Sequence, residues 1–267
     1  MIPAHIKNEK SILGLLDLLP LHNCSQIVQK MEIRPIAYIH TDFKEKFGVP
    51  RQSGLAKHLR GRIVFEKEFR NPDALRGLEG FSHLWLIWEF SANRRDVVKC
   101  NWQPTVRPPR LGGNTQMGVF ATRSPFRPNP LGLSCVKIAG IELNRPYGPV
   151  IEVTGADLMD GTPIYDIKPY IRYADARPEA VCGYVDDLQE RSLKVVLPKE
   201  LSEKIEDKAL IPSLIESLQL DPRPSYHDDQ EREYGMSFAG YNVRFIVSSD
   251  TLLVKNIENY GQETRKD

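Results

Sequence analysis

The sequence predicts a mainly β protein, with a barrel or strongly curved sheet followed by a smaller α+β domain. From Met31 onward, short runs rich in Val, Ile, Phe, Tyr and Trp are bounded by Gly, Pro, Asn or Asp, which is typical of β-strands joined by turns. No long helical segment separates these runs, and this argues against a parallel, doubly wound sheet. The runs are IRPIAYIH, RIVFEKEF, SHLWLIWEF, MGVFAT, SCVKIAGIEL and VIEVTGADL.

Helix and hairpin signals complete the outline. Asn71 suits the N-cap and Pro72 the first position of a short helix in NPDALRGL. After Tyr173, PKELSEKIEDKAL and IPSLIESLQL carry apolar residues at helical spacing. YNVRFIVSS and TLLVKNI then flank Asp250 like the strands of a hairpin. We therefore expect an N-terminal extension over 1–30, a β-barrel domain over 31–175, and a C-terminal α+β domain with a polar tail over 176–267.

The composition bounds the classes of function. With 267 residues, 41% of them hydrophobic, the chain can build a substantial core. Its 36 Lys and Arg nearly balance 35 Asp and Glu, so a polyanion would have to bind at a local cluster of cations. No apolar run reaches the ~20 residues that span a bilayer, and Asp17 and Pro20 interrupt ILGLLDLLPL near the N-terminus. The cysteines lack metal-ligand spacing, so we expect reduced thiols, no metal site and a cytoplasmic location.

The most unusual chemistry lies in two loops rich in proline and arginine. PTVRPPRLGG contains Arg107 and Arg110, and GVFATRSPFRPNPLGLS contains Arg123 and Arg127. Prolines hold the backbone extended, so these cations would be positioned before a ligand arrives. A clamp for phosphate or carboxylate is built in this way. The alternative is a stiff barrel rim whose arginines only keep the protein in solution.

Weaker signals accompany these loops. In DLMDGTPIYDIKPY, Asp160 and Gly161 form a turn that could meet a ligand or could simply close a hairpin. His83 could be a general base, or a buried histidine that donates a hydrogen bond to a backbone carbonyl. Arg223 in DPRPSYH lies in another stiff loop. The basic segments KEKFGVPRQSGLAKHLRGR and NRRDVVK would form a nucleic-acid patch if they shared a face with the arginine loops.

Several common catalytic motifs do not occur in the sequence. There is no G-x-G-x-x-G after a strand, no P-loop, no H-E-x-x-H and no G-x-S-x-G. Dinucleotide redox chemistry, ordinary NTP hydrolysis and serine-hydrolase chemistry therefore lose support, as does a Rossmann-type methyltransferase.

Six motifs follow one another in the order FKEKFGVPRQ, GLEGFSHLWLIW, RPPRLGG, GVFATRSPFRPNPLGLS, DLMDGTPIYDIKPY and DPRPSYH. Taken together, these motifs closely resemble those of the TrmO (TsaA-like) family of tRNA methyltransferases. The resemblance implies a single-sheeted antiparallel β-barrel with a small C-terminal domain, a homodimer, and S-adenosylmethionine bound without a Rossmann fold. It also implies methylation of N6 of threonylcarbamoyladenosine (t6A37) beside the anticodon of certain tRNAs, which gives m6t6A.

The resemblance also implies roles for individual residues. Cofactor contacts fall on Pro50, Arg51, Gln52, Arg123, Leu133, Asp160, Gly161, Thr162 and Pro163. Since methyl transfer to N6 releases a proton, candidate catalytic acceptors are Asp160, Tyr165 and Asp166. Candidate cations for the threonyl carboxylate and the tRNA phosphates are Arg107, Arg110, Arg127 and Arg223. Relatives tend to have Phe-His where this chain has Phe90 and Ser91, so a side-chain contact at Ser91 is not carried over, whereas a backbone contact could be kept.

Two other classes of function stay open. A non-catalytic RNA-binding barrel would use the arginines but would have no need of the turn over 160–163. A phosphate-handling hydrolase would need a nucleophile or a metal cluster that the sequence lacks. Binding of S-adenosylmethionine separates the enzyme from both. We also expect the homodimer to place the DPRP loop of one subunit near the barrel cleft of the other.

Overall fold

A computed structural model of the protein describes residues 32–93, 102–188, 192–223, 229 and 231–260. Contacts divide the chain into Met1–Ile33 and Arg34–Asp267, and the fold described below is that of the second unit. The expected extension over 1–30 lies outside the described residues, as do Arg94, Arg95 and Lys99 of the basic segment NRRDVVK.

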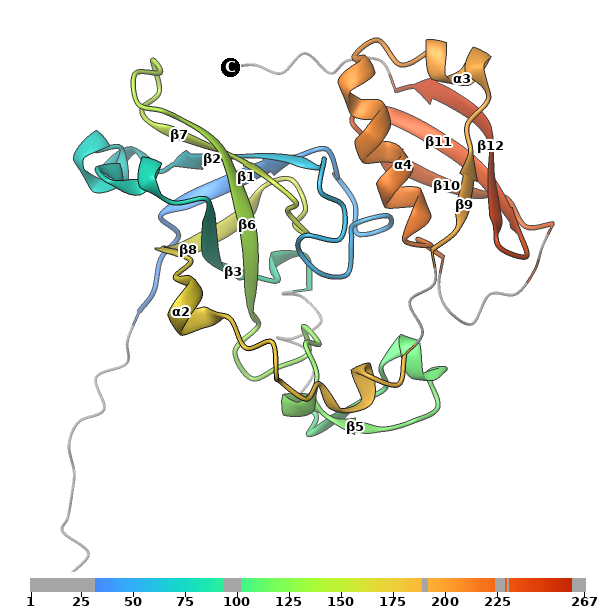
Figure 1. Ribbon diagram of the computed structural model, residues 1–267, viewed down its shortest axis with the longest axis horizontal. Helices are drawn as coiled ribbons and strands as arrows, with labels where there is room; N and C mark the ends of the chain where they lie inside the picture. Colours follow the sequence, from blue (N-terminus) through green and yellow to red (C-terminus); the bar gives the residue numbers. More distant parts are fainter. Residues whose placement is uncertain (1–31, 94–101, 189–191, 224–228, 230, 261–267) are drawn as a thin grey trace, which may run out of the picture. The chain divides into compact units, whose positions relative to one another are not determined.

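The unit begins with a closed antiparallel barrel, which confirms the predicted fold class (Figure 1). Neighbouring strands follow the order β1-β2-β7-β6-β3-β8, and β8 closes the ring by pairing with β1, for example Ile164 with Ala37. The strands are β1 (Ala37–Thr41), β2 (Arg60–Phe65), β3 (His83–Glu89), β6 (Leu131–Glu142), β7 (Val150–Thr154) and β8 (Thr162–Pro169).

Side chains fill the inside of the barrel. Burial alternates along β2 and β3, so that Ile63, Leu84 and Leu86 point inward and are fully buried. Ile151 from β7 and Ile164 from β8 join them in one hydrophobic cluster. Because the interior is packed, a ligand of this barrel has to bind at the rim or outside it.

The segment MGVFAT is not the strand that its composition predicts. Only β5 (Met117–Gly118) is extended, and it pairs with β4 (Thr105–Val106). Val119–Ala121 turns into a 3-10 helix, since both the hydroxyl and the N–H of Thr122 donate to the carbonyl of Val119, at 2.9 and 3.2 Å.

The helix expected in NPDALRGL is a shorter 3-10 turn, Pro72–Leu75. The Asn71 side chain caps it as predicted and accepts from the N–H of Asp73 at 3.0 Å. Arg76 is already extended, with φ −60° and ψ 124°, and ends the helix, and Gly77 follows in a left-handed conformation with φ 88°. The remaining short helices are α2 (Arg172–Asp175) and the 3-10 helices Lys67–Phe69, Leu78–Gly80, Ser91–Asn93, Pro109–Leu111, Gly183–Val185 and Lys208–Leu210.

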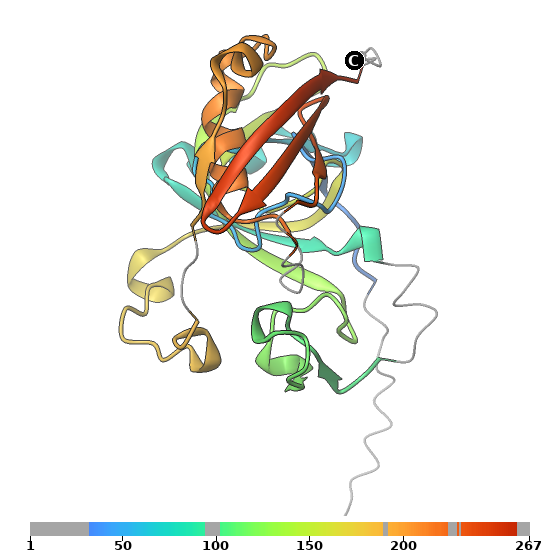
Figure 2. The same cartoon turned by 90° about the vertical axis from the view of Figure 1, so that its right-hand side faces the viewer.

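The C-terminal part is a sheet with a helix on one face (Figure 2). Its strand order is β10-β11-β12-β9, with β9 parallel to β12, and the helix is α4. The helix expected in IPSLIESLQL and the hairpin around Asp250 are confirmed. PKELSEKIEDKAL forms only a five-residue helix, which is followed by the separate 3-10 turn Lys208–Leu210. The bounds are β9 (Lys194–Val196), α3 (Lys199–Glu203), α4 (Ile211–Gln219), β10 (Tyr234–Phe238), β11 (Tyr241–Ser248) and β12 (Thr251–Asn259).

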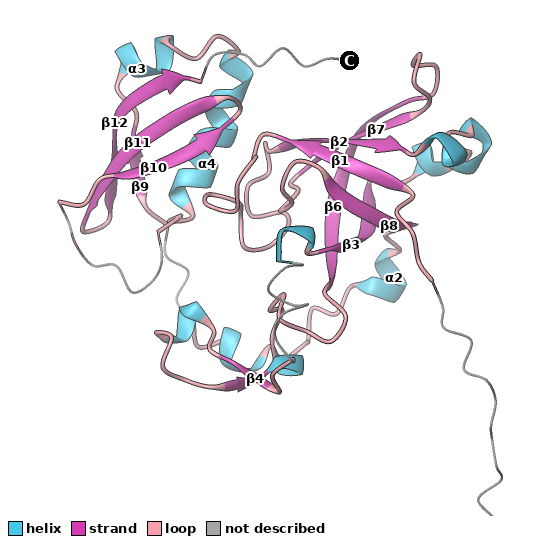
Figure 3. Cartoon of the chain, turned by 180° about the vertical axis from the view of Figure 1, so that it is seen from behind, coloured by secondary structure: helices cyan, strands magenta, loops and turns pink. Residues whose placement is uncertain are grey.

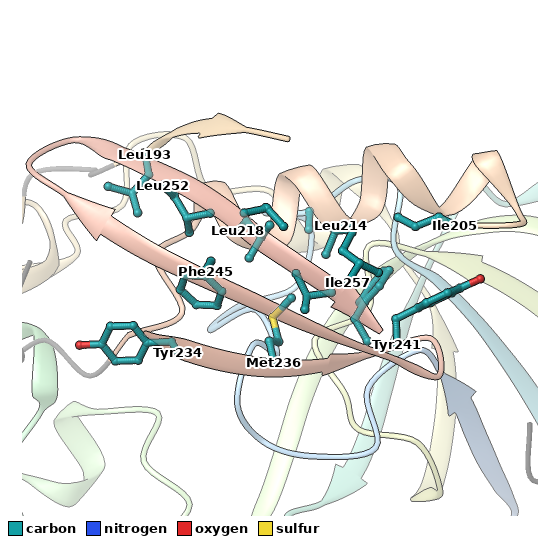
Figure 4. Packing of buried hydrophobic residues seen from close by; sticks show 14 of the residues in the cluster. Leu193, Ile205, Leu214, Leu218, Tyr234, Met236, Tyr241, Phe245, Leu252 and Ile257 are labelled. Atoms are coloured by element: carbon teal, nitrogen blue, oxygen red, sulfur yellow. The ribbon is translucent and has the colours of Figure 1, made fainter. Parts of the chain in front are cut away.

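The core of this sheet includes residues from the chain between β1 and β2. Leu214 and Leu218 of α4 pack in one cluster with Phe245 of β11 (Figure 4). Phe43 and Leu59, which flank the loop after β1, belong to the same cluster. The loop after β1 is therefore anchored at both of its ends. Figure 3 shows the loops that join the strands of the barrel in pink.

Candidate active site

A cavity of about 500 Å³ opens at the rim where β3 ends and where β6 and β8 begin. Segments far apart in the sequence line it: the loop after β1, the end of β3, the arginine loop with the start of β6, and the loop before β8. Its size falls in the range of pockets that hold small-molecule cofactors. The lining residues are 46, 49–52, 85, 88–92, 122, 123, 125, 127, 131–133, 157–159 and 162.

The arginine loop over 118–130 is held in place by Arg127. Nη1 of Arg127 donates to the carbonyl of Thr122 at 2.8 Å, and it lies 3.4 Å from the carbonyl of Ser124. The hydroxyls of Thr122 and Ser124 in turn accept from the N–H groups of Ser124 and Phe126, at 3.3 and 3.2 Å. The loop is thus ordered by its own hydrogen bonds as well as by its prolines. Nη1 of Arg127 is used for these bonds within the loop.

Arg123 joins this loop to the loop after β1. Its guanidinium donates a hydrogen bond to Oε1 of Gln52, and Nε2 of Gln52 donates to the carbonyl of Arg51 at 2.6 Å. Burial lowers the pKa of Arg51, the nearby charge of Arg110 lowers it further, and Asp221 opposes the change. Cations that are crowded and partly desolvated in this way favour the arrival of an anion.

Acidic side chains line the same cavity. Glu89, which is 7% exposed, accepts a hydrogen bond from the hydroxyl of Tyr165. Asp157 accepts one from Oγ of Ser134 at 2.6 Å, and Nε1 of Trp88 donates to that same Oγ at 2.9 Å. Burial raises the pKa of Asp157 above its ordinary value. The cavity therefore combines cations, carboxylates and the aromatic face of a buried tryptophan.

A larger, open groove of about 1260 Å³ adjoins the cavity and shares Arg51 and Arg123 with it. Its walls carry Arg107 and Arg110 together with exposed aromatic rings. Trp102 and Phe120 lie 6.0 Å apart between ring centroids, and Phe120 is 72% exposed. Cations interleaved with exposed aromatic rings suit the phosphates and unstacked bases of a single-stranded nucleic acid. Phe126 and Tyr184 complete the aromatic lining.

The structure brings most of the predicted cofactor residues together. Pro50, Arg51, Gln52, Arg123, Leu133 and Thr162 all line the cavity. Asp160, Gly161 and Pro163 do not. Asp160 instead accepts from the N–H of Thr41 at 3.1 Å and lies 3.2 Å from Nδ1 of His40, and Pro163 pairs with Tyr38. These three residues shape the turn that leads into β8.

The other predicted residues divide in the same way. Tyr165 reaches the cavity through its hydrogen bond to Glu89, whereas Asp166 lies outside and contacts Lys168 at 2.9 Å. Arg223 lines neither hollow, since its guanidinium meets the carboxylate of Asp221 at 2.8 and 2.9 Å. Arg107, Arg110 and Arg127 line the groove, and Ser91 lines the cavity.

Sequence reasoning missed the two cavity carboxylates and the aromatic lining. Glu89 carried a signal, because it is a charged residue inside the apolar run SHLWLIWEF. Asp157 stands in the quoted segment DLMDGTPIYDIKPY, but nothing in the sequence separates it from Asp160. Trp102 and Phe120 are ordinary aromatic residues until the fold places them beside the arginines.

Two further findings concern the described residues alone. Within them, no three His, Cys, Asp or Glu side chains are grouped so that they could hold a metal ion. Across the same residues, no helix has the length and hydrophobicity that crossing a membrane requires.

Comparison with known proteins identifies the family. Residues 38–176 match the model of the tRNA-methyltransferase O N-terminal domain, and residues 190–260 match that of the TrmO C-terminal domain. The chain belongs to the TrmO family. Both the barrel with its cavity and the C-terminal sheet thus lie within TrmO family domains.

Two bacterial relatives and one solved structure are similar to this chain along nearly their whole length. The tRNA (adenine(37)-N6)-methyltransferase of Escherichia coli K12 is 38% identical over 228 residues, which are 83% of this chain and 95% of that protein. A putative S-adenosylmethionine-dependent methyltransferase, RcsF, of Pseudomonas aeruginosa is 39% identical over 80% of this chain and 91% of its own length. The crystal structure of TrmO from Pseudomonas aeruginosa superposes with a TM-score of 0.68 at 30% identity, covering 86% of this chain and 99% of that one.

Proposed function

We propose that this protein is an S-adenosylmethionine-dependent tRNA methyltransferase that acts on N6 of adenosine 37, and that this adenosine carries the threonylcarbamoyl group, so that the product is m6t6A. Membership of the TrmO family supports the reaction, and relatives are named for it. The observation that carries the proposal is the bond between Arg123 and Gln52 at a cavity of cofactor size.

The residues of the cavity fit S-adenosylmethionine, which carries a carboxylate, an ammonium group, a sulfonium and a flat adenine. Arg51 and Arg123 offer cations to the carboxylate. The carboxylates of Glu89 and Asp157 line the cavity and suit a positively charged cofactor, and Leu133, which is 56% exposed, offers an apolar surface. When bound, the cofactor supplies a methyl group on positively charged sulfur. The cavity walls align this group with N6 and exclude water.

The groove fits the anticodon loop that presents the adenosine. Arg107 and Arg110 would meet phosphates and the threonyl carboxylate, and Trp102 and Phe120 would stack on unpaired bases. The groove and the cavity share Arg123, so a nucleotide held in the groove lies next to the cofactor pocket. We also propose that the chain has a barrel domain over 31–175 and a C-terminal domain over 176–267. The core of the C-terminal sheet would support the cavity by anchoring the loop after β1.

The threonylcarbamoyl group explains why this nitrogen can react. N6 of plain adenine is a poor nucleophile because its lone pair is delocalised into the ring, whereas in t6A a neighbouring carbonyl makes its proton easier to lose. A modest acceptor then suffices. Among the predicted candidates, Tyr165 is the one that meets a group lining the cavity, and we assign the acceptance of the proton to its partner Glu89.

We further propose that the protein works as a homodimer in the cytoplasm. The approach of the DPRP loop to the cleft of a partner subunit stays a prediction. Within one chain, Asp221 of this loop lies close enough to Arg51 for its charge to act on that residue. Light scattering across a dilution series, with activity measured on the same samples, tests the assembly. An active monomer would contradict it.

Mass spectrometry of digested tRNA tests the reaction and the substrate together. Protein and S-adenosylmethionine are incubated with tRNA that carries t6A and with the same tRNA lacking that modification. We expect a gain of one methyl group on t6A alone. A gain on unmodified adenosine would contradict the substrate. Cofactor binding without any methylation would favour the non-catalytic RNA-binding barrel.

A further inference from the structure

Asp157 stands where three segments of the cavity meet. Its carboxylate accepts a hydrogen bond from Ser134 of β6 at 2.6 Å and another from the backbone N–H of Ser53, which follows the loop residues Pro50–Gln52. Arg123 of the arginine loop is close enough for its charge to favour the ionised carboxylate. Each of these segments supplies residues that line the cavity, so Asp157 lies beside three of the segments on which a cofactor would rest.

The direction of these hydrogen bonds requires Asp157 to be an acceptor. Nε1 of Trp88 can only donate, and it donates to Oγ of Ser134 at 2.9 Å. Oγ of Ser134 therefore turns its own proton toward Asp157. Ser134 is 1% exposed, so no solvent water competes for the hydrogen bonds of its hydroxyl. The chain of donors from Trp88 through Ser134 thus ends on a carboxylate oxygen at the cavity wall.

A purely structural acceptor at this place would not need a charge. Burial raises the pKa of Asp157, in opposition to the hydrogen bonds and to Arg123, so ionising it in the folded protein carries a penalty. The amide oxygen of an asparagine could accept from Ser134 without that penalty. Charged groups kept in unfavourable surroundings mark functional sites more often than structural ones.

On the basis of the proposed function, we propose that the ionised Asp157 is a positioning and specificity residue that makes the cavity prefer the positively charged cofactor over the neutral product. S-adenosylmethionine carries a sulfonium, and S-adenosylhomocysteine carries an uncharged thioether in its place. A carboxylate at the cavity wall attracts the first and gains nothing from the second. Loss of the charge at methyl transfer would then help the product to leave.

Calorimetric titration of the full-length Asp157→Asn protein with both compounds tests this role. We expect the affinity for S-adenosylmethionine to fall by about tenfold or more and the affinity for S-adenosylhomocysteine to change by less than about threefold. The melting temperature should stay equal or rise. Glu142→Gln is the matched control, because it removes one negative charge at the end of β6, where Glu142 forms an exposed ion pair with Arg145 and does not line the cavity.

Each other outcome overturns the proposal. Equal losses for both compounds would make Asp157 a scaffold residue, and unchanged affinities would leave it no role in cofactor selection. A loss of turnover with both affinities unchanged would make it the proton acceptor instead. If the wild-type protein binds neither compound, the proposed function itself fails, and this inference fails with it.

Discussion

The guanidinium of Arg123 donates a hydrogen bond to the side-chain oxygen of Gln52, which lies 71 positions earlier in the chain. This bond joins the arginine loop to the loop after β1, and both loops line the same cavity. A bond between two mobile side chains would be weak, but Arg127 fixes one loop and the core under the C-terminal sheet anchors the other. Arg123 is therefore held in place before any ligand binds.

The first prediction concerns this contact. Arg123→Ala should lower the affinity for S-adenosylmethionine by about 10- to 100-fold, as expected for a charge-assisted hydrogen bond, and should abolish or severely reduce methylation. Arg123 is exposed, so the melting temperature should not move. Calorimetry and a methylation assay measure both effects. Gln52→Ala should give a smaller loss, because the cation remains. Retained activity with unchanged affinity in Arg123→Ala would contradict the assignment.

The second prediction concerns Gly132, which lies against the indole ring of Trp88 at the cavity wall. A Cβ at this position would overlap the ring, and the ring has no flexible end that could move away. Gly132→Ala should therefore lower the free energy of unfolding by about 1–3 kcal/mol and push Trp88 into the cofactor space. Urea denaturation and cofactor titration measure the two effects. Gly140→Ala is the control in the same strand, since nothing lies within 4 Å of its Cβ position. Equal effects of the two changes would show that Trp88 is not the cause.

Much of the fold could be predicted from the sequence, because alternating burial leaves a visible period in a strand. β3 and β6 were recognisable in this way, whereas MGVFAT was not a strand, since hydrogen bonds from Thr122 to Val119 replaced the sheet pairing. Propensity describes what a residue favours on average. It does not include a bond that a neighbouring side chain makes.

The sequence indicated which segments form the site but not which residues of each segment face the cavity. Asp157 and Asp160 stand in one motif, yet only Asp157 faces the cavity. Gly155 and Gly161 both take left-handed conformations, with φ 77° and 74°, and so redirect the chain on either side of the two carboxylates. Ser134 meets Asp157 because β6 pairs with β7 in a particular register. That register is a property of the closed barrel, and no local pattern specifies it.

The third prediction separates the arginines of the groove. Arg107→Ala should weaken binding of the tRNA and reduce the magnitude of its salt slope by about one, as expected when a phosphate contact is lost. Arg127→Ala should weaken it with little change in slope, because this guanidinium donates to loop carbonyls. Filter binding at several salt concentrations measures both. Cofactor affinity should fall in the Arg127 variant alone, since its loop also carries Arg123. A salt slope that falls in the Arg127 variant and not in the Arg107 variant would assign the phosphate contact to Arg127.

The fourth prediction concerns the aromatic wall. Stacking of a base on an exposed ring contributes about 1–3 kcal/mol, so Phe120→Ala should weaken tRNA binding by roughly 5- to 150-fold and leave cofactor affinity unchanged. Tyr173→Ala is the control, because this ring is 88% exposed but lines neither the cavity nor the groove. Equal losses in both variants would indicate a general surface effect and would exclude stacking at Phe120.

The fifth prediction is the pH dependence of stability that follows from Asp157. Burial raises the pKa of Asp157 in the folded protein, so between its ordinary value and the raised value the folded state binds more protons than the unfolded state. The contribution of this group to stability is therefore complete at low pH and is lost as the pH rises through the raised pKa. Arg123, the cation that faces it, reduces this loss without reversing it.

Removing the carboxylate should remove this dependence. Melting temperatures of the wild-type and Asp157→Asn proteins, measured without ligand from about pH 4 to pH 8, should diverge as the pH rises, with the variant becoming the more stable of the two. The divergence should reach a plateau once the wild-type carboxyl is fully ionised. A variant that is less stable by the same amount at every pH would mean that the hydrogen bonds to Ser134 and Ser53 outweigh the penalty of burying the charge.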